Sequence, residues 1–417
     1  MKRRDFLKGV VAVSALVACG STESSGASKA VSQVMSPALN RQARVVLAGV
    51  TKGSSEAAIK SAVRESALAA SDFSWLGKND AVFIKPVLNS GSSYPSTTSP
   101  IAIAAMVALL REKGAGRVIV GDMSGIGHVK LSPTGLSGST RKLMEAAGIA
   151  KAAEAAGGEL HFFEEAGWNA FYEDPMTAGT HWKSGLMMPN ILKEVQHIIL
   201  MPRCGRHVLA GCTLGLKAAV GYWRTDTRLE YHRDAATFHE KTAEANTART
   251  LLQKQRLVIS AADKILTTFG PDTGYVHQPE TGLIIAAESV VAHDMVSLAW
   301  LLENKRQIPA DKQDGLVNTS PLVARLANYF VVGKLGGWKP AIASDTLIKN
   351  DLQTIWDDRV LNHAYQIFGG VPKLTIAAAN TELPVNLKKL LSKMTMVLGN
   401  KSGNSKQGIS YEEKNKS

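Results

Sequence analysis

Short apolar runs rich in β-branched residues alternate along the chain with longer stretches rich in Ala and Leu. Such short runs are typical of buried strands, and the longer stretches are typical of helices. The pattern predicts strands at Arg44–Val50, Ala81–Pro86, Arg117–Asp122, Leu160–Phe163, His197–Met201, Leu257–Ala261, Gly282–Ala287 and Leu374–Ala379. It predicts helices at about 55–70, 100–114, 139–156, 234–255, 293–304, 320–333, 358–368 and 384–397.

The predicted strands are apolar over most of their length and are separated by helices. This arrangement indicates an α/β fold with a largely parallel central sheet flanked by helices. The length of the chain also allows two lobes with a cleft between them. In such sheets ligands bind beyond the carboxyl ends of the strands, so the polar residues that follow each strand are the first candidates for a site.

The first nineteen residues follow another pattern: a basic opening with Arg3 and Arg4, an apolar run over 10–17, and Cys19. The apolar run is far shorter than the roughly 20 residues that cross a bilayer. The four residues that end at Cys19 resemble a lipobox. These features predict a twin-arginine signal over residues 1–19 and a lipid on Cys19. In the alternative, the signal is an ordinary cleaved one and Cys19 has no role.

The segments on either side of the body are polar. Residues 20–40 are rich in Ser, Gly and Ala and predict a flexible tether, and residues 399–417 predict a disordered Lys-rich tail. Residues 41–398 are predicted to form the α/β body. The expected location is outside the cytoplasm after twin-arginine export. The membrane partner would be bound through the lipidated Cys19, on the outer face of the cytoplasmic membrane or at the outer membrane.

Charge and cysteine content limit the partners and cofactors. The formal charge of +12 at pH 7 indicates acidic partners, such as anionic lipid or polyanionic substrates, and a small anionic ligand is the partner expected at the site. No Lys- and Arg-rich block with interleaved aromatic residues occurs, so no nucleic-acid partner is expected. Besides Cys19 the chain has only Cys204 and Cys212, without a Cys-x-x-Cys pair, so an iron–sulfur cluster is not expected. The cofactor is left unknown, with a divalent metal ion as a candidate.

The first candidate site segment begins at Lys85, at the end of a predicted strand. Burial there would lower the pKa of its amine into a range useful for acid/base catalysis or carboxylate binding. Asn89 and Thr98 follow closely and are predicted to bind the ligand. In the alternative, Lys85 extends its amine to solvent.

Two carboxylates are candidates for binding a metal ion or orienting a ligand. Asp122 ends a predicted strand and opens a Gly- and Ser-rich loop that runs to Gly127, whose N–H groups could approach an anion. Asp294 lies at the start of the helix predicted at 293–304. Each has an alternative as a structural cap, Asp122 of a turn and Asp294 of a helix N-terminus.

The segment 203–217 carries the densest set of candidates. Arg203, Arg206 and Thr213 are predicted to bind an anionic ligand, and His207 and Lys217 to act in acid/base catalysis. Thr213 and Lys217 share one face if the segment is helical. The alternative is a basic surface turn.

The remaining cysteines and histidines leave several interpretations open. Cys204, His207 and Cys212 could bind a metal, the two cysteines could form a disulfide, or the thiols could be unrelated. Their spacing matches no standard zinc pattern. His232 and His239 are two helical turns apart and are predicted to lie on a solvated helix face.

Several of these segments carry a resemblance to a known family. They are Lys85-Pro86-x-x-Asn89, Thr98-Ser99-Pro100, Arg117–Asp122, Arg206–Lys217 and His293-Asp294. In this order they resemble the bacterial and archaeal family known as domain of unknown function 362, over roughly residues 44–304. The resemblance implies an α/β fold with these motifs near one site.

The chain also departs from the family pattern. Many members carry a ferredoxin-like module with clustered cysteines, which this chain lacks. Ala218 stands where the family usually has Asn, and Gly205 where it usually has Lys. These departures weaken cluster-linked electron transfer as a function. In its domain architecture the family also distantly resembles the nickel-dependent lactate racemases. This resemblance implies acid/base chemistry at a hydroxy-acid carbon.

The combined prediction is a membrane-anchored enzyme that performs acid/base or metal-assisted chemistry on a small anionic metabolite. The main alternative is a non-enzymatic lipoprotein that binds an anionic ligand or a metal for another complex. A structural envelope protein is a third interpretation.

Overall fold

The computed structural model describes residues 42–313, 320–349 and 351–396. These residues belong to one compact unit, so the two lobes that the sequence allowed do not form among them. The predicted signal, tether and tail lie outside the described residues, and so does Cys19. Within the described part, no helix combines the length and apolar character needed to cross a bilayer.

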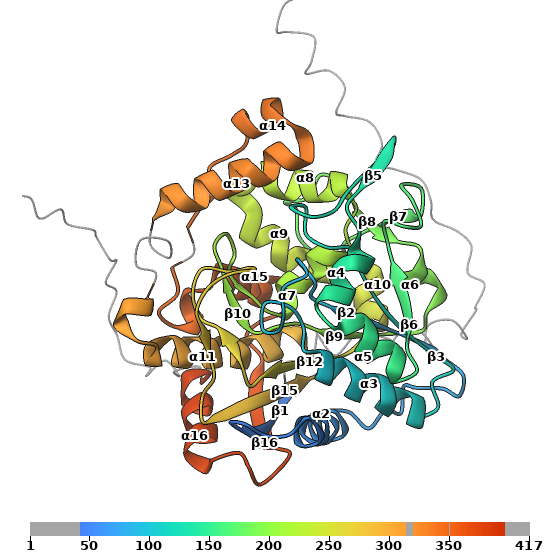
Figure 1. Ribbon diagram of the computed structural model, residues 1–417. Helices are drawn as coiled ribbons and strands as arrows, with labels where there is room; N and C mark the ends of the chain where they lie inside the picture. Colours follow the sequence, from blue (N-terminus) through green and yellow to red (C-terminus); the bar gives the residue numbers. More distant parts are fainter. Residues whose placement is uncertain (1–41, 314–319, 350, 397–417) are drawn as a thin grey trace, which may run out of the picture. The chain divides into compact units, whose positions relative to one another are not determined.

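The eight predicted strands are all confirmed, and together they make one eight-stranded sheet (Figure 1). From edge to edge the order is β16 (Lys373–Ala378), β1 (Gln42–Thr51), β15 (Thr281–Ala287), β12 (Gln255–Ala262), β9 (His197–Met201), β2 (Ala81–Pro86), β3 (Arg117–Asp122) and β6 (Glu159–Phe162). Only β15 runs against its neighbours, β1 and β12. The sheet is therefore largely parallel, as predicted.

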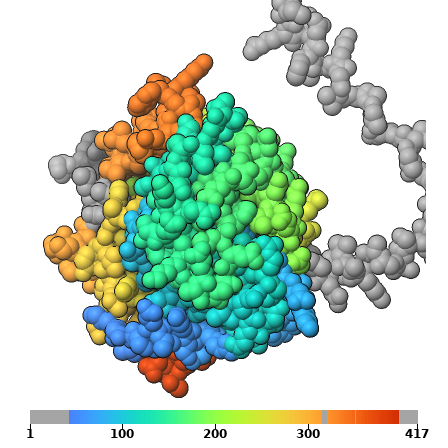
Figure 2. Space-filling model, turned by 45° about the vertical axis from the view of Figure 1, so that its right-hand side comes forward, coloured from blue at the N-terminus to red at the C-terminus, as the bar shows by residue number. Residues whose placement is uncertain are grey.

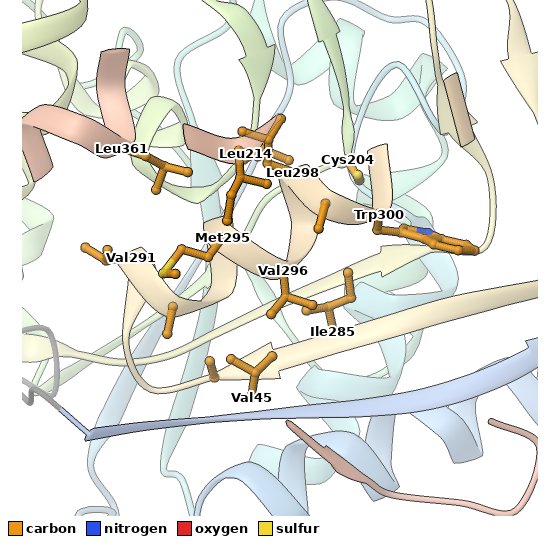
Figure 3. Close-up of a cluster of buried hydrophobic side chains, with 14 of the residues drawn as sticks. Val45, Cys204, Leu214, Ile285, Val291, Met295, Val296, Leu298, Trp300 and Leu361 are labelled. Atoms are coloured by element: carbon orange, nitrogen blue, oxygen red, sulfur yellow. The ribbon is translucent and has the colours of Figure 1, made fainter. Parts of the chain in front are cut away.

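Helices pack on both faces because the strand residues alternate between two cores. Val82 and Ile84 of β2 pack with helices α2 (Glu56–Ala70), α3 (Pro100–Glu112) and α5 (Ile149–Ala155). On the opposite face, Val45 and Ile285 pack against α11 (Val290–Gln307) (Figure 3). Phe83 belongs to a third cluster on that opposite face, over β2, β3 and β9.

Several predicted helices have different limits in the structure. The helix predicted at 139–156 is divided at Gly148, whose φ of 77° is left-handed, into α4 (Thr140–Ala146) and α5. The helix predicted at 234–255 is replaced by α9 (Phe238–Glu244) and α10 (Arg249–Lys254). A helix that was not predicted, α8 (Thr225–Arg233), precedes them. The other helices are α6 (Ile191–Glu194), α7 (Gly215–Ala218), α13 (Pro321–Gly336), α14 (Trp338–Ile342), α15 (Arg359–Ile367) and α16 (Val385–Met394).

Short strands outside the main sheet were not predicted. They form the hairpins β4 (Lys130–Ser132) with β5 (Gly135–Ser137) and β7 (Phe171–Asp174) with β8 (Leu186–Pro189), and a small sheet of β11 (Gly211–Thr213), β10 (Gly205–His207), β13 (Ile265–Leu266) and β14 (Val276–His277). Strands of two to four residues are too short to show a clear alternating pattern. The small sheet matters because β10 and β11 carry much of the segment 203–217.

Candidate functional site

A small cavity of about 60 Å³ lies beyond the carboxyl ends of β2, β3 and β9. The strand order reverses between β2 and β9, which is where open α/β sheets commonly bind ligands. Seven of the predicted site residues line it: Lys85, Asn89, Asp122, Arg203, His207, Thr213 and Lys217. A volume of this size holds a few water molecules or a small anion.

Lys85 and Asp122 form a buried ion pair at the base of this cavity. The Nζ of Lys85 lies 2.9 Å from Oδ1 of Asp122, and both side chains are almost completely buried. The carboxylate also accepts the backbone N–H groups of Met123 (2.8 Å) and Leu88 (3.0 Å). Burial lowers the pKa of Lys85 and raises the pKa of Asp122, against the attraction between the two charges. Asp122 is therefore placed to orient Lys85, and its binding of a metal ion stays a prediction.

The backbone at Gly221 covers this ion pair. A Cβ atom at Gly221 would lie 2.4 Å from Nζ of Lys85 and 2.5 Å from Oδ1 of Asp122. A side chain at this position would therefore have to displace the pair.

Arg203 and Lys217 bring positive charge to the other side of the cavity. One guanidinium nitrogen of Arg203, Nη2, donates to the hydroxyl of Thr213 (3.0 Å) and to the carbonyl of Arg206 (3.2 Å). Its Nε and Nη1 are buried and have no hydrogen-bond partner in the described part of the chain. Burial, Arg203 and Arg228 together lower the pKa of Lys217 to about 7. Lys217 is thus poised to exchange a proton near neutral pH.

His207 lines the same cavity as a neutral donor. Its Nδ1 accepts the backbone N–H groups of Leu209 (3.1 Å) and Ala210 (3.3 Å). Burial and the nearby charges of Lys217 and Arg203 lower its pKa well below the usual value. The ring proton therefore resides on Nε2, and His207 can donate a hydrogen bond to an anion. It is poorly suited to accept a proton as a general base, one of the roles considered from the sequence.

Arg228 is the charged residue of the cavity lining that the sequence did not indicate. It belongs to α8 and donates to the carbonyls of Ser124 and Met123, each at 2.7 Å. It holds the loop after β3 in place, and burial lowers its pKa to about 10, so it stays charged at neutral pH. No sequence signal marks it, because α8 has little apolar periodicity.

Three predicted site residues lie outside the cavity lining. Arg206 is next to His207 in β10, and neighbouring strand residues point to opposite faces. Thr98 joins two strand ends, accepting from the N–H of Val87 (2.8 Å) and donating to the carbonyl of Met201 (2.6 Å). Arg206 and Thr98 therefore do not line this cavity, and the ligand-binding roles predicted for them stay predictions.

Asp294, the third of these residues, does not cap its own helix. α11 begins at Val290 and is capped by Ser289, which places Asp294 in the second turn. Its two carboxylate oxygens accept the N–H groups of Gly215 (2.8 Å) and Leu216 (2.7 Å) at the start of α7. Asp294 thus positions the short helix that carries Lys217, and its binding of a metal ion stays a prediction.

Asn89 also has a structural partner, although it lines the cavity. Its amide nitrogen donates to both carboxylate oxygens of Asp272, at 2.9 Å each. This contact joins the loop after β2 to the loop after β13. Asn89 therefore shapes the cavity wall by holding the two loops together.

The remaining predictions on cysteine and histidine also have clear outcomes. Cys204 and Cys212 are free buried thiols, so they form no disulfide. Cys204 lies in the core with Leu298 and Trp300, and burial raises its thiol pKa to about 12, which disfavours the thiolate that metals bind (Figure 3). His232 and His239 are buried in two separate helices, so the prediction of a solvated helix face was wrong.

A family model for domain of unknown function 362 (DUF362) matches residues 82–299, slightly more than half of the chain. The chain belongs to this family. None of the curated protein sequences matches it.

Two solved structures are similar in part. A crystal structure of a Thermotoga maritima protein has a TM-score of 0.38 and 12% sequence identity, covering 61% of this chain and 59% of that one. The lactate racemase apoprotein from Thermoanaerobacterium thermosaccharolyticum has a TM-score of 0.36 and 14% identity, covering 54% of this chain and 50% of that one. The matched part thus spans about half to three fifths of either structure. At these values neither likeness assigns a reaction to this chain.

Proposed function

We propose that this chain is an enzyme that binds a small carboxylate or phosphate in the cavity and moves a proton with Lys217. The observation that carries the proposal is the set of charges around a space of about 60 Å³. Lys85, Arg203, Lys217 and Arg228 supply cations, whereas Asp122 is the one carboxylate of the lining. The excess of positive charge favours an anion, and the small volume favours one of few atoms.

The donors differ in what they can do for such an anion. Arg203 has two buried nitrogens, Nε and Nη1, without a hydrogen-bond partner among the described residues, and an anion could accept from them. His207 can add a third donor through Nε2. Lys217 differs from both because its pKa of about 7 lets it hold or release a proton at neutral pH. Binding is therefore assigned to Arg203 and His207, and proton transfer to Lys217.

A non-enzymatic binding protein is the second candidate, favoured by the unpaired donors of Arg203. It would need the anion-binding groups but no titrating amine. Turnover separates the two candidates, since only the enzyme requires Lys217 to lose its proton.

Anion binding can be tested by thermal shift with lactate, malate and inorganic phosphate. We expect at least one of these anions to raise the Tm of the full chain, and Lys217→Glu to remove the shift by reversing the charge at the cavity. Arg64→Ala, far from the cavity in an exposed ion pair, is the matched control and should respond like the wild type. An equal response of the wild type and Lys217→Glu would contradict an anion site at this cavity.

We further propose that the chain is exported by the twin-arginine route and held at a membrane by a lipid on Cys19. The sequence of residues 1–19 supports this proposal. The orange segment with α13 and α14 projects from the top of the molecule in Figure 2. Exposed apolar side chains on these two helices add support, because a bilayer would cover them. They are Leu322, Leu326, Phe330, Trp338 and Ile342. Arg325, Lys334 and Lys339 lie among them and suit an anionic lipid surface.

Cell fractionation tests the anchor. We expect Cys19→Ser to move most of the protein from the membrane fraction to the soluble exported fraction, and Arg3→Lys with Arg4→Lys to retain it in the cytoplasm. Adding Trp338→Ala and Ile342→Ala to Cys19→Ser should remove the residual membrane association. If Cys19→Ser alone leaves the distribution unchanged, the lipid anchor is wrong.

A further inference from the structure

Two imidazoles and a carboxylate meet outside the cavity described above. His181 lies in the loop between β7 and β8, Glu244 ends α9, and His363 belongs to α15. Nδ1 of His181 and Nε2 of His363 lie 2.5 Å and 2.9 Å from the same oxygen, Oε1 of Glu244. The three potential ligand atoms all lie within 4.8 Å of one another. None of the three residues lines the anion cavity.

The loop that carries His181 is built closely around Glu244. The carboxylate accepts the backbone N–H groups of Thr180 (3.2 Å) and His181 (3.1 Å). A Cβ atom at Gly179 would lie 2.2 Å from the carboxyl carbon of Glu244, and the φ of Gly179 is 99°. Only glycine therefore lets the loop approach this closely. The same loop is tied to α9 and α10 through Thr247, which donates its hydroxyl proton to the carbonyl of Ala178.

The second nitrogen of His363 has an outer partner. Nδ1 of His363 lies 3.3 Å from Oε1 of Gln366. With its proton on Nδ1, the ring would present the lone pair of Nε2 on the side of Glu244, where a cation could bind both the nitrogen and the carboxylate. This arrangement, with an outer partner on the far nitrogen, is typical of a metal-ligating histidine.

We propose that His181, Glu244 and His363 bind one divalent transition-metal ion, for which zinc is the probe. Two imidazole nitrogens and one carboxylate oxygen suit zinc and its neighbours in the first transition row, whereas calcium and magnesium prefer oxygen ligands alone. The side chain of Glu244 is 1% exposed, whereas those of His181 and His363 are 31% and 15% exposed. Solvent water can therefore complete the coordination. The ion would join the β7–β8 loop, α9 and α15, and it is independent of the proposed anion chemistry.

Zinc titration of the full chain, after removal of metal by a chelator and without a histidine tag, tests this site. We expect one zinc per chain by elemental analysis, and a rise in Tm of about a few degrees at saturation. His181→Ala and His363→Ala should each reduce the affinity for zinc by at least about tenfold, as should Glu244→Gln. The matched control is His128→Ala, because His128 lies 4.0 Å from the carboxylate of Asp272 without a second histidine.

The Tm of each variant in chelator shows whether it still folds. A variant that folds and binds zinc like the wild type would overturn the assignment of its ligand. Absence of stoichiometric zinc in the wild type at millimolar zinc would overturn the site altogether. In that case the hydrogen bonds of Glu244 to the two rings and to the backbone of the β7–β8 loop hold the three segments together.

Discussion

Replacing Lys217 by arginine is expected to abolish turnover while leaving anion binding in place. Arginine keeps the positive charge, but its pKa is too high for it to lose a proton. General acid/base groups contribute about 10² to 10⁴ in rate, so a loss of that size is expected. The measurement is hydrogen–deuterium exchange at carbon in small carboxylates dissolved in D₂O, followed by NMR. Turnover retained in Lys217→Arg would mean that Lys217 contributes charge only.

The pH dependence of the wild type gives a second measure of the same residue. As a general base, Lys217 must be neutral, so kcat/KM should fall as the pH drops below the Lys217 pKa of about 7. The slope should be tenfold per pH unit, with a plateau above. A plateau that extends unchanged to pH 5 would contradict this role.

Stability reports on Lys217 even without a substrate. In the unfolded chain Lys217 has an ordinary pKa of about 10.4, whereas in the folded chain its pKa is about 7. Between these two pKa values the unfolded state holds more protons, so the free energy of unfolding increases as pH rises from 7 to 9. Lys217→Met should make this increase smaller, as measured by urea unfolding at both pH values.

Removing one partner of the Lys85–Asp122 pair is expected to have the largest effect on stability. Lys85→Met leaves a buried carboxylate without its cation, which costs about 3–5 kcal/mol in the free energy of unfolding. Denaturant unfolding measures this loss. Lys85→Met combined with Asp122→Leu should recover part of it, because no unpaired charge then stays buried.

The exposed pair of Arg64 and Glu112 provides the control for this experiment. Its nitrogen and oxygen are also in contact, but both side chains are open to solvent. Arg64→Ala should therefore leave the free energy of unfolding nearly unchanged. If Lys85→Met changes the free energy of unfolding as little as Arg64→Ala does, the Lys85–Asp122 pair contributes little to stability. The role of Lys85 is then to bind the ligand.

The main sheet could be predicted from sequence because its strands carry nearly uniform apolar runs. The rule that ligands bind beyond strand ends then placed Lys85, Asp122 and Lys217 near one another, and the structure brings them around one cavity. Arg206 was misplaced because its direction depends on the register of a strand of three residues. No pattern in one segment reveals such a register.

The polar helices were the least predictable part of the molecule. α8 reads as a charged, exposed sequence, yet it buries Arg228 and His232. Its burial depends on partners far along the chain: the carbonyl of Met123 for Arg228 and the amide of Asn328 for His232. The cluster of His181, Glu244 and His363 was missed for the same reason, since its members are separated by 63 and 119 residues.

The bare backbone at Gly221 has a consequence for how this site can diversify. Because a side chain at position 221 would collide with Lys85 and Asp122, almost no residue other than glycine is tolerated there. Selection for a different ligand would have to act on other residues of the cavity lining, such as Val87 and Pro271. Libraries aimed at new specificity are therefore best directed to those residues.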